Sequence, residues 1–184
     1  MWRDRQRPAQ TGRPLHSLRW VGNGEKMSYT IDSNLRQFVD IDPNKMLEFL
    51  RKKQATELIK IVSEVIAVGR QMNINPLYIL AHAILESGWG KSEIATKKNN
   101  LFGYGAYDEN PMDNAFTFPT KKNCLWYVMG KVAHRYLTPT GSNDTGRFWG
   151  GSPTLAGMNK FYASDLHWGE KIAKLMNQIE ETIV

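Results

Sequence analysis

The strongest constraint on the fold is the run over residues 77–86, which is apolar on nearly every side and ends in Glu86. Asn75 and the proline after it precede this run, and an asparagine cap followed by proline is a strong helix start. Gly88 and Gly90 follow the run, and glycines end helices because they adopt left-handed backbone angles without strain. A helix that is apolar all round belongs in a protein interior. The pattern therefore predicts a buried central helix with a carboxyl group at its C-terminal end.

The rest of the chain is also mainly helical in pattern. Apolar residues recur every three or four positions over residues 55–72, which predicts one long amphipathic helix. Asp42 and Pro43 repeat the start signal of the central helix. Further helices are predicted over residues 43–52, about 120–137, about 153–162, and from a cap at Ser164 and Asp165 to residue 183.

Residues 99–119 differ from the rest in being rich in Gly, Asn, Asp and Pro. They also contain the alternating run AFTF over residues 115–118. Alternation next to turn residues predicts a loop and a small β-hairpin. The expected fold class is α+β, mainly α, with a helical lobe and a small β-hairpin lobe.

The length of 184 residues suits one domain. The net charge of +6 is uneven, because residues 1–26 hold six basic and two acidic residues, a balance of +4. We predict a disordered basic arm over residues 1–26 and a single domain over residues 27–184. The codons for residues 24–27 can resemble a bacterial ribosome-binding site before a start codon, so Met27 is an alternative start. The domain itself is mildly basic and has no recognition motif, so we expect no nucleic-acid partner.

Glu86 is the main catalytic candidate. A carboxyl group at the end of an apolar helix is costly to ionise, so its pKa should rise, and a raised pKa suits a general acid. A glutamate at a helix end is more often solvated, so position alone is a weak signal. Gly88 and Gly90 favour a sharp turn that leaves space beside the carboxyl group, and Trp89 is predicted to shield it from water.

Three blocks of the sequence resemble, in the same order, the bacterial endo-β-N-acetylglucosaminidases of glycoside hydrolase family 73. The first block is the helix end that contains Glu86, the second is rich in Asn, Gly and Tyr, and the third lies near the C-terminus. Together they place the resemblance over roughly residue 75 to the end of the chain. The blocks are residues 83–90 (AILESGWG), 99–108 (NNLFGYGAYD), and the closing group 154–159 (TLAGMN), 162–165 (YASD) and 168–173 (WGEKIA).

The resemblance implies a lysozyme-like fold in which a glycan groove lies between the helical lobe and the hairpin lobe. It implies hydrolysis of the β-1,4 bond after N-acetylglucosamine in peptidoglycan, without a cofactor, and Glu86 inherits the role of general acid. Aromatic and asparagine positions of the blocks inherit substrate binding. These substrate-binding candidates are Asn100, Phe102, Tyr104, Tyr107 and Tyr162, and Trp89 joins them as the wall beside Glu86.

The second catalytic group stays open at this point. Glycosidases usually pair the proton donor with another carboxylate. Asp108 is the first choice, and Glu109 and Asp113 are alternatives that also suit plain turn formation. The N-acetyl group of the substrate is a further possibility, since it can assist at the anomeric carbon.

Other conspicuous residues are expected to pack. His82 lies four residues before Glu86 on the same helix face, where a packed or hydrogen-bonded neighbour is expected rather than a metal ligand. We predict no metal site. The lone Cys124 is expected to be an inert buried residue. Trp126 and Trp168 are predicted to pack, and the remaining candidate for stacking on sugar is Trp149.

Alternatives within the enzymes are a muramidase or a lytic transglycosylase on a similar fold. Outside the enzymes, the alternative is a glycan-binding or virion structural module with a dead site. No apolar run is long enough for a membrane span or signal peptide, so we expect no membrane insertion. A monomer acting on the bacterial cell wall is expected, released by lysis or a holin or carried on a virion. These settings include a phage endolysin, a tail component and a bacterial autolysin.

Overall fold

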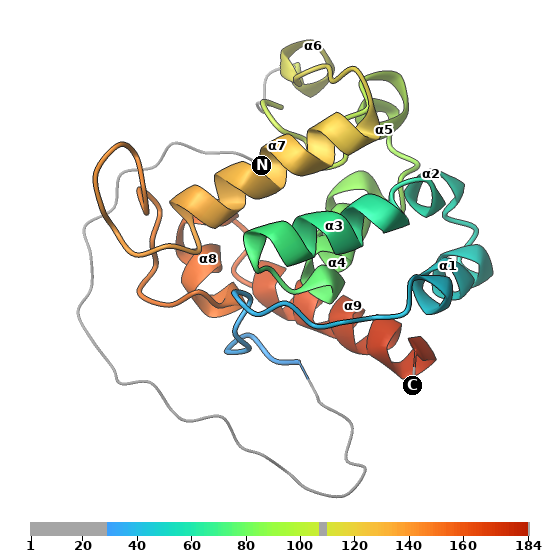
Figure 1. Ribbon diagram of the computed structural model, residues 1–184. Coiled ribbons are helices and arrows are strands. Elements are labelled where there is room, and N and C mark those ends of the chain that lie inside the picture. Colours follow the sequence, from blue (N-terminus) through green and yellow to red (C-terminus); the bar gives the residue numbers. More distant parts are fainter. Residues whose placement is uncertain (1–28, 107–109, 184) are drawn as a thin grey trace, which may run out of the picture.

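The computed structural model describes residues 29–106 and 110–183, and these form a mainly helical domain (Figure 1). This confirms the expected fold class in its main part. The helices are α1 Pro43–Lys52, α2 Thr56–Ile59, α3 Val62–Met72, α4 Pro76–Ser87, α5 Glu93–Lys97, α6 Pro111–Asn114, α7 Lys121–Arg135, α8 Leu155–Tyr162 and α9 Trp168–Ile183. None of the helices in the described residues is long and apolar enough to cross a membrane.

The helix α4 lies at the centre of the domain, as its apolar sequence predicts. It packs along α9 and against α3, while α7 packs against α3 and α8 packs against α9. Figure 1 shows α3 in front of α4, with α7 running above them and α9 crossing below. The Asn75 side chain accepts a hydrogen bond from the backbone N–H of Leu77 and so caps the start of α4. Burial on all sides fixes this helix in the core.

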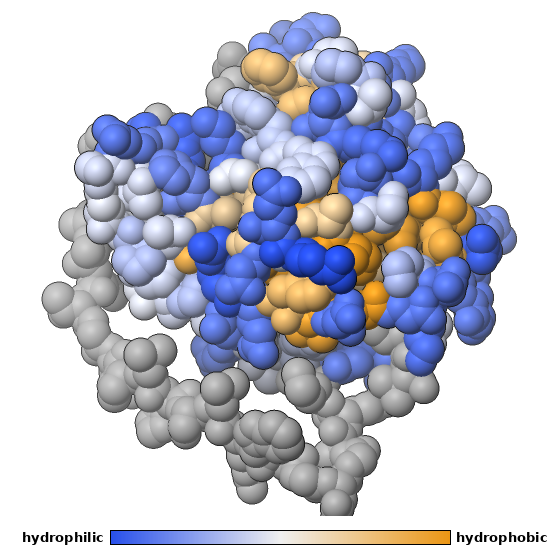
Figure 2. Space-filling view, in the orientation of Figure 1, coloured by the Kyte–Doolittle hydropathy of each residue, from blue (hydrophilic) through white to orange (hydrophobic). Residues whose placement is uncertain are grey.

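The segment before α1 ties distant parts of the domain together. The Asn177 side chain of α9 accepts a hydrogen bond from the Tyr29 N–H and donates one to the Tyr29 carbonyl. The Leu35 N–H donates to the Pro153 carbonyl at 2.8 Å, and the Leu35 carbonyl accepts from the Asn75 N–H at 2.9 Å. The segment crosses the face of the molecule that Figure 1 and Figure 2 show. In Figure 2 that face carries apolar surface bordered by hydrophilic side chains. The N-terminal part of the described chain therefore closes the core on this side.

The prediction of one long helix over residues 55–72 is wrong. The chain forms the short α2, breaks at Lys60 and Ile61, and continues as α3. Ile61 has φ of −114° and ψ of 2°, outside the helical range. The break turns α2 toward the residues that follow α4, because Gly90 lies against the side chains of Glu57 and Leu58. Apolar spacing continues through the break, so it could not reveal it.

The prediction of a small β-hairpin within residues 99–119 is not met by the described residues there. They form loops and α6, and contain no strand. The Phe116 N–H donates to the Tyr104 carbonyl, and the Phe118 N–H donates to the Lys98 carbonyl, both at 2.9 Å. These two bonds bring the segments side by side without a regular ladder. Side chains hold much of this loop instead, as described below.

Candidate active site

Glu86 lies in the last turn of α4, where the chain leaves the core through an unusual turn. Gly88, Trp89 and Gly90 all have left-handed φ values, of 55°, 63° and 78°. The Ser87 hydroxyl group donates to the Ala83 carbonyl and accepts from the Gly90 N–H at 2.7 Å. The sharp turn expected from the two glycines is therefore present. A side chain at position 88 would meet no atom within 4 Å, so this glycine is needed for its backbone angle.

The Glu86 carboxyl group is mostly shielded from water. Its side chain is 15% exposed, and its Oε1 accepts a hydrogen bond of 2.9 Å from the Trp168 indole Nε1. Burial raises the pKa of this carboxyl group above its ordinary value of 4.5, while the Trp168 hydrogen bond acts in the opposite direction. The net rise is the property that a general acid needs.

His82 lies one turn before Glu86 and is fully buried. Its Nδ1 is 3.1 Å from the Tyr78 hydroxyl group and its Nε2 is 2.7 Å from the Tyr162 hydroxyl group. Its ring meets the rings of Phe102 and Trp168 edge to face, with centroids 5.0 and 5.3 Å apart. The expectation of a packed, hydrogen-bonded neighbour is confirmed. The described residues contain no cluster of three or more side chains suited to a metal ion.

Tyr162, predicted to bind substrate, is buried behind the carboxyl group. Its ring packs on that of Trp168 at 4.7 Å, and its hydroxyl group contacts His82. The structure thus brings together Glu86, His82, Tyr162 and Trp168. These residues come from α4, α8 and α9.

Trp168 is the residue of this group for which the sequence favoured a packing role over contact with sugar. It does pack, but its N–H also reaches Glu86 from 82 residues away. Its position at the start of the last helix, inside the closing block of the resemblance, was the available signal. Trp89, predicted to shield Glu86, packs against the residues of α1 and its C-terminal end. Its ring lies 5.9 Å from that of Phe49, and Lys53 Nζ lies 5.9 Å from its centroid.

Asn100 and Phe102 are buried rather than open to a groove. The Asn100 Nδ2 donates to the carbonyls of Tyr104 and Phe116, both at 2.9 Å, and its Oδ1 accepts from the Tyr104 N–H at 3.0 Å. Phe102 packs against His82. These two side chains hold the loop against the site, and their burial does not favour direct contact with a ligand.

An aromatic cluster joins this loop to α7; its members are Tyr104, Phe116, the buried Phe118 and, on α7, Tyr127. Phe116 is 54% exposed and Tyr127 is 41% exposed, and their rings are nearly parallel, at 12°. The Tyr104 ring meets the Tyr127 ring edge to face at 5.3 Å. Sequence reasoning chose Tyr104 but missed Phe116 and Tyr127, because an aromatic residue on a strand or helix is usually a core residue.

Most candidates for the second catalytic carboxylate lie outside the described residues. Tyr107, Asp108 and Glu109 lie outside the described residues, as does the arm over residues 1–26. Asp113 lies exposed on α6 rather than on a β segment.

The other conspicuous residues from the sequence lie as follows. Trp126 and Trp149 are both partly buried. Cys124 is buried, and burial raises the pKa of its thiol to about 12, which confirms the expectation of an inert residue.

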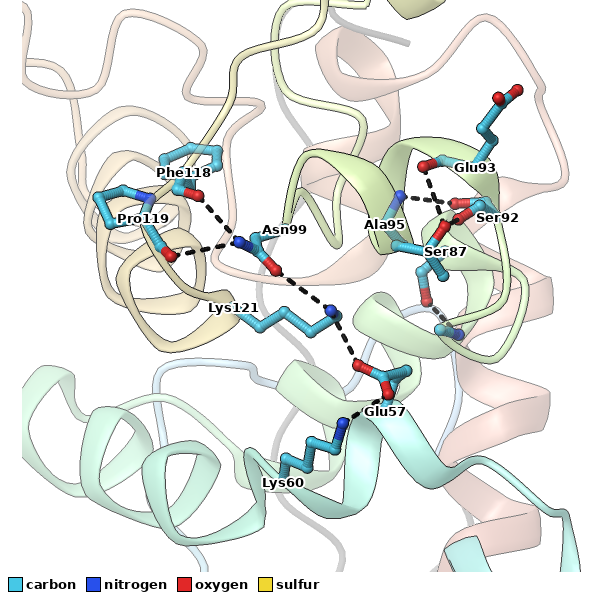
Figure 3. A network of polar contacts seen from close by, with 12 residues as sticks. Glu57, Lys60, Ser87, Ser92, Glu93, Ala95, Asn99, Phe118, Pro119 and Lys121 are labelled. Carbon is cyan, nitrogen blue, oxygen red and sulfur yellow. Dashed lines mark hydrogen bonds and ion pairs between the residues drawn. The ribbon is translucent and has the colours of Figure 1, made fainter.

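A polar network joins the loop to α2 and α7 (Figure 3). Lys121 Nζ lies 2.9 Å from Glu57 Oε2 and 3.2 Å from Asn99 Oδ1. The Asn99 Nδ2 donates to the carbonyls of Phe118 and Pro119. Glu57 also pairs with Lys60 at 2.6 Å. The network joins both ends of the loop between α5 and α7 to α2. The α2 residue Glu57 lies against Gly90, in the turn that follows Glu86.

The mainly helical fold, with a glutamate at a helix end that is shielded from water and has a raised pKa, is the arrangement of a lysozyme-like glycosidase domain. The chain belongs to the glucosaminidase family, described as mannosyl-glycoprotein endo-beta-N-acetylglucosaminidase, whose sequence profile matches residues 62–181. This confirms the resemblance to glycoside hydrolase family 73.

Individual relatives agree with this family. A Streptococcus pneumoniae protein that carries the name endo-beta-N-acetylglucosaminidase is 43% identical over 111 residues, which cover 60% of this chain and 16% of that protein. A bifunctional autolysin of Staphylococcus aureus is 26% identical over 166 residues, 77% of this chain and 13% of that protein. The chain therefore spans only a small part of the length of these relatives.

Solved structures show the same fold. A catalytic mutant of S. aureus Autolysin E, in complex with the disaccharide NAG-NAM, matches with a TM-score of 0.60 and 21% identity over 86% of this chain and 73% of that chain. S. aureus glucosaminidase B matches with a TM-score of 0.55 and 21% identity over 82% of this chain and 64% of that chain.

Proposed function

We propose that this domain hydrolyses the glycan strands of peptidoglycan, at the β-1,4 bond after N-acetylglucosamine, with Glu86 as the general acid. The observation that carries the proposal is the shielded position of Glu86 beside Trp168. A protonated carboxyl group there can protonate the glycosidic oxygen as the bond breaks. Family membership supports the reaction type, and the NAG-NAM complex of the related autolysin supports the substrate class.

In this mechanism the Trp168 N–H stabilises the ionised form of Glu86. When Glu86 gives up its proton, its Oε1 becomes an anion, and the indole N–H is already placed to stabilise it at 2.9 Å. The Glu86 carboxylate later takes up a proton again, which restores the acid for the next cycle. Asp108 is proposed as the partner that acts at the anomeric carbon, and the N-acetyl group of the substrate is the alternative that needs no second carboxylate.

Glycan binding is proposed for the loop that Asn100 and Phe102 support. Exposed aromatic rings pack well against the apolar faces of sugars, and Tyr104 with Phe116 and Tyr127 offers such rings. Tyr107 keeps the role proposed from the sequence. Tyr162 stays in the proposal as a residue that packs on Trp168 beside Glu86, and Trp89 stays as part of the turn that follows Glu86.

The first test compares Glu86→Gln with the wild type on purified peptidoglycan. The amide keeps the shape of the side chain but has no acidic proton, so the rate should fall about 10²–10⁴-fold. Glu93→Gln is the matched control, because Glu93 is exposed and pairs with Lys97 on α5. Full activity in Glu86→Gln would remove this residue from the mechanism. No activity in the wild type would favour a binding module.

The second test identifies the bond that is cut. Borohydride reduction of the products labels each new reducing end. The proposal predicts reduced N-acetylglucosamine. Reduced N-acetylmuramic acid would show a muramidase, and a 1,6-anhydro product would show a lytic transglycosylase.

A further inference from the structure

We propose that Asn159 of α8 is a positioning residue that holds the start of α9, so that the Trp168 indole N–H stays on the Glu86 carboxyl group. The proposal rests on the proposed function of Glu86 as proton donor and adds a residue that acts on it through Trp168. It follows from the two hydrogen bonds of the Asn159 side chain, which both go to backbone groups beside Trp168.

The Asn159 side chain binds the chain on both sides of Trp168. Its Nδ2 donates to the Asp165 carbonyl, and its Oδ1 accepts from the Gly169 N–H, both at 2.8 Å. A backbone carbonyl only accepts and a backbone N–H only donates, so the orientation of the amide is fixed. The backbone N–H of Trp168 donates to the same Asp165 carbonyl at 3.2 Å. One side chain of α8 therefore holds the first turn of α9.

Ring packing alone would hold the indole less precisely. Trp168 lies against Tyr162 at 4.7 Å and against His82 at 5.3 Å, and apolar packing is not directional. The hydrogen bond from the indole to Glu86 Oε1 is directional and 2.9 Å long, so a small slide or rotation of α9 would weaken it. The two bonds of Asn159 resist such a movement, because they fix the backbone before and after Trp168.

The consequence for Glu86 is a donor that stays in place. An indole N–H donates and does not accept, so it stabilises the ionised carboxylate more than the neutral acid. Burial raises the pKa of Glu86, and the Trp168 hydrogen bond offsets part of that rise. Loss of Asn159 should therefore raise the pKa of Glu86 further and leave its anion less well stabilised after proton transfer.

The titratable neighbours of Glu86 keep one state at neutral pH. On α4, burial lowers the pKa of His82 to about 3 and raises that of Tyr78 well above its ordinary value. On α8, burial raises the pKa of Tyr162 in the same way. The ionisation of Glu86 can thus be followed without interference from these three groups.

The charged groups at the start of α9 lie on its exposed side. A hydrogen bond from Lys171 lowers the pKa of the Asp165 carboxyl group. His167 is exposed and its Nδ1 lies 3.0 Å from Glu170 Oε2. The His167 ring carbons are followed in the same titrations, so that its ionisation is separated from that of Glu86.

The indole proton of Trp168 gives the first test. In the wild-type chain, the ¹H shift of the indole N–H should change with pH at the same midpoint as the Glu86 carboxyl carbon. In Asn159→Leu the size of this change should fall, because the hydrogen bond is weaker. An indole shift that does not follow Glu86, or that follows it equally in both proteins, would overturn the proposal.

The second test measures the pKa of Glu86 by ¹³C NMR in the wild type and three variants. Trp168→Phe removes the donor and keeps an aromatic ring, so the pKa should rise by about half a unit or more. Asn159→Leu should raise it by part of that amount. Adding Asn159→Leu to Trp168→Phe should change it no further, because Asn159 acts through the indole. An unchanged pKa in Asn159→Leu, or a further rise in the double variant, would contradict the proposal.

Asn177→Leu is the matched control. Asn177 also lies on α9 and makes the same pair of bonds, to the N–H and the carbonyl of Tyr29, at 2.6 and 2.8 Å. Its loss should destabilise the domain about as much as Asn159→Leu but leave the pKa of Glu86 unchanged. Equal pKa changes in the two variants would mean that lost stability is the cause, and Asn159 would have no positioning role. Asn159→Ala and Asn177→Ala replace the leucine variants if these do not fold.

Activity separates this proposal from the proposed function. If both hold, Asn159→Leu should lower kcat with little change in KM, and the alkaline limb of its pH profile should move to higher pH together with the pKa of Glu86. An alkaline limb that stays in place while the pKa of Glu86 moves would still support Asn159 as the positioning residue, but would contradict Glu86 as the proton donor.

Discussion

The helix α4 and the loop formed by residues 98–106 and 115–119 lie next to each other, yet they are stabilised in different ways. The side chains of α4 are buried on all sides, and its backbone bonds are those of a helix. The loop has few regular backbone bonds, and Lys98, Asn99 and Asn100 donate to its carbonyls instead. The helix holds Glu86 through the packing of many apolar groups. The loop depends on a few polar side chains, each of which should matter by itself.

The largest expected effect is on the helix. Ile79→Ala leaves a cavity in the fully buried side of α4 and should lower the free energy of unfolding by about 2–5 kcal/mol. The loss should involve the whole domain, so all amides should lose hydrogen-exchange protection together. Ile31→Ala, at an exposed isoleucine, is the matched control and should cost less than about 1 kcal/mol. A small, local effect of Ile79→Ala would contradict the role given to α4.

The next effect is on the loop. Asn100→Leu keeps the volume but removes the side-chain acceptor of the Tyr104 N–H and the side-chain donor to the Phe116 carbonyl, at a cost of about 1–3 kcal/mol. Urea denaturation measures the loss, and hydrogen exchange should show it first at the Tyr104 amide while α4 keeps its protection. Thr117→Val, at an exposed position of the same loop, should be nearly neutral. Equal loss of protection in α4 would mean that the two regions unfold as one.

The polar network around Lys121 should contribute less. Lys121→Met removes its contacts with Glu57 and Asn99 and should cost about 1 kcal/mol, measured by thermal unfolding. The Lys121 side chain is 11% exposed, so this cost should survive in high salt. Lys97→Met removes an exposed pair with Glu93 and should cost less, with any cost lost in salt. Equal costs for the two variants would show that burial of the network is unimportant.

The smallest effect concerns stability and pH. The pKa of Glu86 in the folded chain is raised above that of the unfolded chain. Its contribution to stability is therefore present below about pH 4.5 and is lost as pH rises through the folded pKa. The melting temperature of Glu86→Gln relative to that of the wild type should therefore increase as pH rises. Glu93→Gln should show the opposite trend, because pairing with Lys97 lowers the pKa of Glu93.

The same contrast explains what the sequence could predict. The start, end and burial of α4 follow from local signals at Asn75, Gly88 and the apolar run between them, and the structure confirms them. The hairpin within residues 99–119 was predicted from alternation at residues 115–118. Alternation does not show that Asn100 and Lys98 will take the carbonyls that a strand would use. The break between α2 and α3 was missed because apolar spacing passes through it.

The site residues also fall into those that local sequence predicts and those that only tertiary packing brings together. Glu86 and the neighbouring His82 follow from spacing on one helix. The contacts of Trp168 and Tyr162 with this pair come from α9 and α8, about 80 residues along the chain, and no local pattern encodes them. The exposure of Phe116 and Tyr127 likewise depends on how the loop packs against α7.

The most direct test of the whole account is the titration of the Glu86 carboxyl group in the wild-type protein, followed by ¹³C NMR. We expect a midpoint above 4.5, because burial of the side chain leaves the carboxylate poorly solvated and outweighs the opposite effect of the Trp168 hydrogen bond. A midpoint at or below 4.5 would show a carboxylate that is ionised at neutral pH. Glu86 would then not be the proton donor.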